Sequence, residues 1–287
     1  MTAIYSKPCW RVSMVLLKVF RTPADHIRNR SSVMRRVAVG MALVSLGTFF
    51  SADLARAENS TSGWVIDTDL YAAWQGRNDV QVPNDSTGSR FALDRLTGDG
   101  PYLAPRVQLS WPSSGRREWR VLLAPLSLSN EGVSTAPIRF QGANFASGPV
   151  DARYQFNSWR GTVRWRWIDR DDLVVKVGFT AKIRDASIRL RQGALSAKKD
   201  NTGFVPLLHG AFERPLGSGW RVEGDIDALA GGQGYAVDAG LKLMKSMDDE
   251  WSVGASVRFL DGGADNDEVY AFARFTSAGV SIRWQPR

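Results

Sequence analysis

Cysteine and histidine are almost absent from this 287-residue sequence, which contains one cysteine, Cys9, and two histidines, His26 and His209. Ordinary zinc sites need several ligands of these two types, so such sites are excluded. A single cysteine also excludes an internal disulfide. After residue 57 there is no cysteine at all, which fits an exported chain that carries out no thiol chemistry.

Long apolar runs are equally scarce. The one extended run, Val37 to Phe50, has 14 residues, fewer than the roughly 20 that a membrane-spanning helix requires. It follows Arg35-Arg36 and precedes Ala55-Arg-Ala57, a small-x-small cleavage site, and this order is typical of a signal peptide. The arginine pair also fits a twin-arginine export signal, but a barrel must cross the inner membrane unfolded, which favours general secretion. We expect export, cleavage near Ala57 and a mature chain from Glu58, with Met34 as a candidate translation start.

The formal charge of +8 is misleading as a guide to the whole chain. Residues 1–57 hold nine of the 37 basic residues and two of the 29 acidic ones, which leaves 28 basic and 27 acidic residues over 58–287. A basic domain that binds nucleic acid therefore has no support. We expect two parts: a leader with its signal peptide over residues 1–57, and one functional domain over residues 58–287.

The stretch from Trp159 to Ile168 shows the pattern that dominates the functional domain. Aromatic and aliphatic residues occupy one parity, arginines occupy the other, and side chains alternate faces along a strand. In a soluble sheet the aromatic face would be buried. In a membrane barrel it would face lipid, and the arginines would face a polar lumen. One strand does not decide between these two arrangements.

The same alternation recurs between turn residues and predicts about ten strands. These strands cover residues 64–74, 102–111, 118–128, 151–168, 173–192, 202–216, 220–229, 235–247, 251–260 and 268–284. Tight connections follow the second, fourth, sixth and eighth strands, and the other connections, such as residues 75–101, 129–150 and 193–201, are longer. Outer-membrane barrels have this order, with short periplasmic turns and longer outer loops. In the fifth strand a change of apolar parity predicts a bulge near Asp185-Ala186.

Tryptophan residues gather at the ends of the expected strands, and small or aliphatic residues such as Val253, Ala255 and Val257 occupy the middle. Aromatic rings at strand ends mark the two membrane–water interfaces of a barrel. The predicted fold class is therefore all-β: a single closed antiparallel transmembrane β-barrel of about ten strands, preceded by a signal peptide, in the outer membrane of a Gram-negative cell. A soluble periplasmic β-barrel that acts as a binding protein is an alternative.

Charged residues of both signs occupy the parity that would face the lumen. A barrel of about ten strands has a narrow interior in which isolated charges are costly, so we expect ion pairs to fill and plug it. The candidates for this polar network are Arg160, Arg164, Arg166, Lys182, Arg184, Asp185, His209, Glu223, Asp225, Asp227, Asp238 and Arg258.

His209 is the one residue that suggests catalysis. It shares the expected lumen face with Glu213, and an outer-membrane hydrolase could use it as a general base with a serine or aspartate partner. Its place in the middle of a strand, away from the loops where substrates would approach, favours a structural role instead.

Two further stretches have a functional and a structural interpretation. The basic run Lys182-Ile-Arg-Asp185, followed by Arg189 and Arg191, could bind lipopolysaccharide phosphates or pair with aspartates on neighbouring strands. The acidic stretch from Gly262 to Glu268 resembles a calcium loop but lacks the ligand spacing of an EF-hand. We expect a solvated outer loop there, and no metal or cofactor.

Three stretches give the chain a resemblance to a family of bacterial outer-membrane β-barrel proteins without an assigned activity. They are Phe179-Thr-Ala-Lys-Ile-Arg-Asp185, Gly203-Phe-Val-Pro-Leu-Leu-His209 and Gly262-Gly-Ala-Asp-Asn-Asp-Glu-Val-Tyr270. The resemblance implies the fold and the location, and it supplies no catalytic residues. The chain departs from many barrels at its end, where Gln285-Pro-Arg287 follows the last aromatic residue.

The expected function is therefore a structural or surface-interaction role without catalysis. The expected partners are outer-membrane lipids, lipopolysaccharide and the outer-membrane assembly machinery. The competing hypothesis is a hydrolase that modifies lipid A or the envelope and uses His209.

Overall fold

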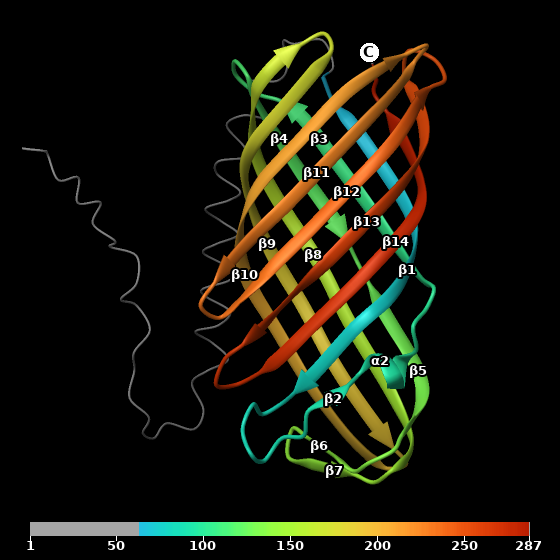
Figure 1. Cartoon of the computed structure of the whole chain (residues 1–287), viewed down its shortest axis with the longest axis vertical. Coiled ribbons are helices and arrows are strands. Elements are labelled where there is room, and N and C mark those ends of the chain that lie inside the picture. Colours follow the sequence, from blue (N-terminus) through green and yellow to red (C-terminus); the bar gives the residue numbers. More distant parts are fainter. Residues whose placement is uncertain (1–62, 287) are drawn as a thin grey trace, which may run out of the picture. The chain divides into compact units, whose positions relative to one another are not determined.

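A computed structural model describes residues 63–286, so the predicted leader and its cleavage site lie outside the described residues. Ten strands form one closed antiparallel sheet (Figure 1). They are β1 (Val65–Gln81), β3 (Tyr102–Pro112), β4 (Arg117–Ala124), β8 (Gly148–Arg170), β9 (Leu173–Gln192), β10 (Leu195–Gly217), β11 (Trp220–Gly231), β12 (Gly234–Ser246), β13 (Trp251–Asp265) and β14 (Tyr270–Trp284). The first and last strands pair from Ile66↔Trp284 to Gln81↔Tyr270 and close the barrel. The predicted all-β class and the closed antiparallel barrel of about ten strands are confirmed.

Smaller elements occupy the two longest predicted loops. Strand β2 (Phe91–Ala92) pairs with β1, and α2 (Asp94–Thr97) follows it. Strand β5 (Ser127–Ser134) pairs with β8 beyond the end of β4, and β6 (Ile138–Phe140) and β7 (Ala143–Phe145) form a separate hairpin. No helix within residues 63–286 is long and apolar enough to cross a membrane.

The two ends of the barrel differ (Figure 1). Short connections join β3 to β4, β8 to β9, β10 to β11 and β12 to β13 at one end, here called the turn end. The opposite end, here called the cap end, carries β2, α2, β6 and β7. The expected loop over residues 193–201 is wrong, because β10 already begins at Leu195. Strands β8, β9 and β10 instead continue as sheet at the cap end.

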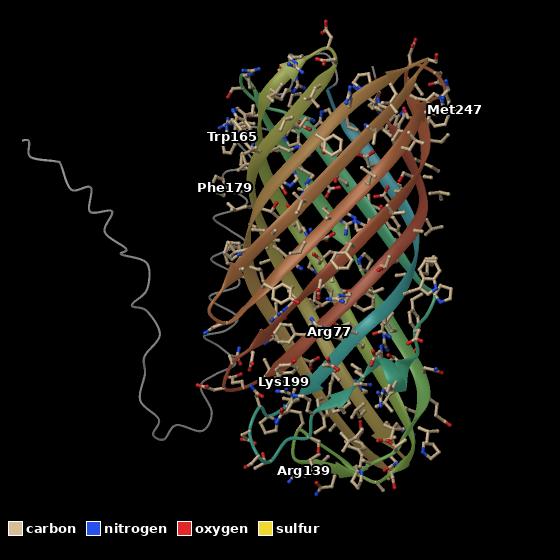
Figure 2. The ribbon with its side chains drawn as sticks, viewed as in Figure 1. Arg77, Arg139, Trp165, Phe179, Lys199 and Met247 are labelled. Atoms are coloured by element: carbon tan, nitrogen blue, oxygen red, sulfur yellow. The ribbon has the colours of Figure 1, made fainter. Side chains whose placement is uncertain are left out.

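The outer surface of the barrel is apolar where the strands cross its middle. Leu70 and Val280 are directly paired and both exposed, while the neighbouring Asp69 and Ser281 are buried. Figure 2 shows Trp165 and Phe179 projecting from the outside of the wall. At the turn end, the rings of Trp251 and Trp284 stack at a centroid distance of 6.2 Å. Apolar side chains outside and charged side chains inside are the arrangement typical of a membrane barrel.

The pattern inverts in the part of the sheet that extends to the cap end. The row of outward residues Trp159, Ile183 and Phe204 is followed by the outward row Asn157, Asp185 and Thr202, in matching register. Beyond that row the inward residues become apolar and form an outer core, as in a soluble protein. The outer core consists of Val80, Val82, Leu93, Leu96, Leu128, Ile138, Phe140, Phe145, Val150, Ala152, Tyr154, Ile188, Leu190, Ala197, Ala273 and Phe275.

This inversion replaces the bulge predicted near Asp185-Ala186. Neither ladder of β9 shifts register there, and Ile188 and Leu190 point inward in unbroken alternation. The apolar residues change face because the environment outside the strand changes, and the strand itself stays regular. The predicted bulge is therefore wrong.

Arginine substitutions at two exposed valines test the boundary between the two environments. Val280 is 57% exposed in the middle of the apolar surface, and Val133 is 67% exposed on β5 at the cap end. We expect Val280→Arg to lower the free energy of unfolding by about 2–4 kcal/mol, because its charge would enter hydrocarbon. Val133→Arg should change it by less than about 0.5 kcal/mol. Urea unfolding in lipid vesicles, followed by tryptophan fluorescence, measures both, and equal effects would contradict the assignment.

Candidate functional site: the lumen ion-pair network

Arg160 lies at the centre of the lumen. Its Nη1 donates to Asp227 Oδ2 at 2.7 Å and its Nη2 donates to Asp238, and all three side chains are at most 4% exposed. Arg160 belongs to β8, whereas Asp227 and Asp238 belong to β11 and β12. Two strands separate β8 from β11 in the sheet. The contacts therefore reach across the interior instead of running along one ladder.

Further arginines complete a central layer around these two carboxylates. Asp227 also accepts from Arg120 at 3.0 Å, Asp238 accepts from Arg258 and from Arg106 at 3.4 Å, and Asp225 accepts from Arg258 at 2.6 Å. The central layer consists of Arg106, Arg120, Arg160, Arg258, Asp225, Asp227 and Asp238. Several charged donors on each carboxylate offset the cost of removing it from water.

His209 adjoins the central layer. Its Nδ1 lies 2.8 Å from Asp227 Oδ1, which also accepts a hydrogen bond from the Thr180 hydroxyl at 2.8 Å. Its other nitrogen, Nε2, is buried and has no hydrogen-bond partner among the described residues. Glu213, which the sequence places on the same face, bonds to Lys176 instead. In the described part of the chain, the aspartate–histidine pair therefore has no hydroxyl nucleophile on the nitrogen that would act as base.

A second group of ion pairs lies between the central layer and the turn end. Glu118 contacts Arg164 at 2.7 Å and Lys176 at 2.9 Å. Arg283 bridges Asp67 at 2.7 Å and Glu223 at 2.6 Å. These six residues share the inward parity of their strands, which is the only signal in the sequence that points to Glu118 and Arg283. Alternation thus identifies the face of the sheet, and the structure identifies the partners.

The sequence candidates occupy five different places in the structure. Arg160, Asp225, Asp227, Asp238 and Arg258 form most of the central layer, with His209 beside it, and Arg164 and Glu223 belong to the turn-end group. Lys182 and Arg184 line a cavity on the cap-end side. Arg166 is exposed near the turn end, 3.8 Å from Asp169. Asp185 is on the outward face, where it accepts hydrogen bonds from Gln155 and Asn157, so its expected place in the lumen is corrected.

Two cavities adjoin the central layer from opposite sides. The cap-end cavity has a volume of about 510 Å³, and Asp227 and Asp238 are among its lining residues. The turn-end cavity has a volume of about 250 Å³ and is lined by Arg120, Asp225 and Arg258, among others. The ion pairs therefore lie between the two spaces. No cluster of residues that could hold a metal ion occurs within residues 63–286.

A closed ten-strand antiparallel sheet with an apolar exterior and an ion-paired interior defines the class of outer-membrane β-barrels. No family model matches the chain, and no curated protein gives a significant match. Among solved structures, the translocator domain of the autotransporter NalP from Neisseria meningitidis is similar, with 8% identity and a TM-score of 0.34 over 86% of this chain and 97% of that one.

Two other similar structures are an attachment invasion locus protein and a porin. Ail, the attachment invasion locus protein of Yersinia pestis, in complex with the heparin analogue sucrose octasulfate, has 10% identity and a TM-score of 0.36, covering 78% of this chain and 100% of that one. The KdgM porin in complex with disordered oligogalacturonate has 12% identity and a TM-score of 0.33, covering 78% and 99%. The assignment to the class comes from the wall and lumen of this chain.

Removing one carboxylate from the central layer should destabilise the barrel. We expect Asp227→Ala to lower the free energy of unfolding by about 3–5 kcal/mol, because Arg120 and Arg160 would each lose a buried carboxylate partner. The matched control is Asp172→Ala, which breaks the exposed contact with Arg170 at 3.0 Å and should cost at most about 1 kcal/mol. Urea unfolding of both variants in the same vesicles provides the comparison, and similar losses would refute a stabilising central layer.

Proposed function

We propose that this chain is a non-enzymatic outer-membrane β-barrel whose lumen is closed by the central layer, with a structural or surface-interaction role. The observation that carries the proposal is Arg160 held between Asp227 and Asp238, with the two cavities on either side. Opening a continuous path would separate paired charges in a poorly hydrated interior, which is costly. Such a barrel presents its cap end to the surroundings and does not conduct.

The location and the partners follow from the two ends. The turn end faces the periplasm and the cap end faces outward, because short turns are periplasmic in outer-membrane barrels. Basic residues lie at the cap-end rim, where the Arg90 guanidinium covers the Tyr270 ring at 3.7 Å and Arg274 binds Asp261 at 2.7 Å. Arginines at the cap-end rim could bind the phosphates of lipopolysaccharide. Insertion by the outer-membrane assembly machinery and leader cleavage near Ala57 remain predictions.

The absence of catalysis is supported by the environment of His209. A general base must reach the proton that it removes, and Nε2 is buried with no partner among the described residues. The pair with Asp227 therefore serves to satisfy a buried carboxylate. A soluble periplasmic binding barrel is disfavoured by the many large apolar side chains exposed around the barrel, among them Leu103, Val280 and Phe179.

Conductance in planar lipid bilayers tests the closed lumen. The wild-type barrel should give no steady single-channel current. The triple variant Arg160→Gly, Asp227→Gly and Asp238→Gly removes the three side chains at the centre of the layer, so we expect it to join the two cavities and to give steady openings. The control variant, Arg170→Gly, Asp171→Gly and Asp172→Gly, alters a turn-end connection and should stay silent. Stable channels from the wild-type protein would contradict the proposal.

A second experiment separates the proposal from the hydrolase and soluble-protein hypotheses. Wild-type protein should sediment with washed outer membranes and migrate faster on a gel without heating, because a closed sheet resists detergent at room temperature. His209→Ala should leave the mass profile of lipid A in those membranes unchanged. A changed profile would support the hydrolase, and recovery in the osmotic-shock fraction would support the soluble barrel.

A further inference from the structure

The barrel wall is incomplete beside the cap-end cavity. The ladder between β10 and β11 ends at Leu208↔Ala228, although β11 continues to Gly231. On the same cap-end side of that pair, β10 begins at Leu195. Its residues 195–207 pair only with β9 within the described sheet. Pro206 stands in this unpaired stretch, and proline is confined to strand edges because it lacks an N–H. In Figure 1, strands β8 to β10 extend further toward the cap end than the β11–β12 and β13–β14 hairpins do.

The cap-end cavity extends through this gap to the outside of the barrel. Its lining includes Leu207, which points inward and is 3% exposed, and Phe204, which points outward and is 64% exposed. Because residues 195–207 have no ladder with β11, lining residues from both faces of β10 indicate that the cavity passes around this strand edge. Leu229 and residues 231–237 of the β11–β12 hairpin line the opposite side.

The gap lies at the border of the apolar surface. Phe204 pairs with Ile183, which pairs with Trp159, and these three side chains form the last apolar outward row. The next outward row is polar, with Asp185 at its centre. A molecule in the lipid layer with its head group at the membrane surface would therefore meet the opening at the height of that head group.

Two cations face the cavity without a carboxylate partner among the described residues. Lys182 is 4% exposed and lines the cavity, and its Nζ lies 4.8 Å from the Phe156 ring centroid, with no hydrogen bond or ion pair to another described residue. Arg184 donates to the Asn201 side chain, and its Nε is buried with no hydrogen-bond partner within residues 63–286. The carboxylates at the cavity floor, Asp227 and Asp238, already bind arginines of the central layer.

The remaining walls are mostly apolar, with Tyr154, Phe156, Leu207, Leu229 and Leu260 among them. A volume of about 510 Å³ falls in the range of roughly 300–1,000 Å³ that small-molecule sites occupy. We propose that the cap-end cavity binds a single-chain amphiphile with one anionic head group, which enters sideways from the membrane between β10 and the β11–β12 hairpin. Lys182 and Arg184 bind the head group, and the apolar walls cover the chain. This site does not depend on the closed lumen.

Direct binding to the purified barrel in a neutral detergent tests the site. Radiolabelled decanoate should bind with a stoichiometry near one, and unlabelled decyl phosphate should compete if the site accepts any single anionic head. Decanol, which has no charge, should compete at least tenfold more weakly. A barrel that binds neither anion, or that binds decanol equally well, would overturn the proposal. A wild-type barrel that conducts ions and binds decanoate would contradict only the closed lumen.

Substitutions identify the residues that recognise the anion. Lys182→Met should weaken decanoate binding at least tenfold, whereas Lys182→Arg, which keeps the charge, should retain most of it. Lys198→Met is the matched control, because Lys198 is exposed and pairs with Asp200 at 2.7 Å. Heat-modifiability of each variant on a gel checks folding. Unchanged binding by folded Lys182→Met would refute the site.

A crosslink tests the lateral route. Pro206→Cys and Ala230→Cys lie on opposite sides of the gap, and the described chain holds no other cysteine. Joining them with a short bis-maleimide should slow uptake of decanoate from vesicles at least tenfold, while the same variant capped with N-ethylmaleimide should take it up at the wild-type rate. Unchanged uptake after crosslinking would exclude this route.

Discussion

The attraction between Arg160 and the two carboxylates of Asp227 and Asp238 ties separate parts of the barrel wall together. A closed sheet of ten strands encloses an interior too narrow to hydrate many charges freely, so each inward charge depends on a partner from another strand. The central layer meets that demand by sharing carboxylates among four arginines. The same contacts lie between the two cavities of the lumen, so residues of the central layer line both.

The outer faces of the long strands β8, β9 and β10 pass from a hydrocarbon environment to water. Along β9, Phe179 faces hydrocarbon while Thr180 faces the polar lumen, and a few residues later Arg189 faces water while Leu190 enters the outer core. Alternation continues unbroken through both regions. The change takes place between the rows of Ile183 and Asp185, at the level of the gap beside β10. The cap-end cavity therefore lies where the polar lumen gives way to the apolar outer core, which explains why cations and aromatic rings share its walls.

Much of the barrel could be predicted because strand parity and turn residues are local signals. The predicted and observed bounds of β9 agree at both ends, because the turn residues Asp171-Asp172 and Gly193 lie directly before and after the strand. Other features depend on distance across the fold. The sequence does not predict the cap-end part of β10, because its exposed polar residues Lys198 and Asp200 are typical of a loop. Asp185 is predicted in the correct strand but on the wrong face. No local pattern could show that Arg160 meets Asp238, since parity says nothing about height or position around the barrel.

The inversion on β8, β9 and β10 has a consequence for how securely these strands are aligned. A slip of one residue exchanges the two faces along the whole strand. In β9 such a slip would turn Lys182 into the acyl chains and Leu190 into water at the same time. The same slip would thus be unfavourable in both environments. The register of each long strand is therefore stabilised independently in its membrane part and in its cap-end part.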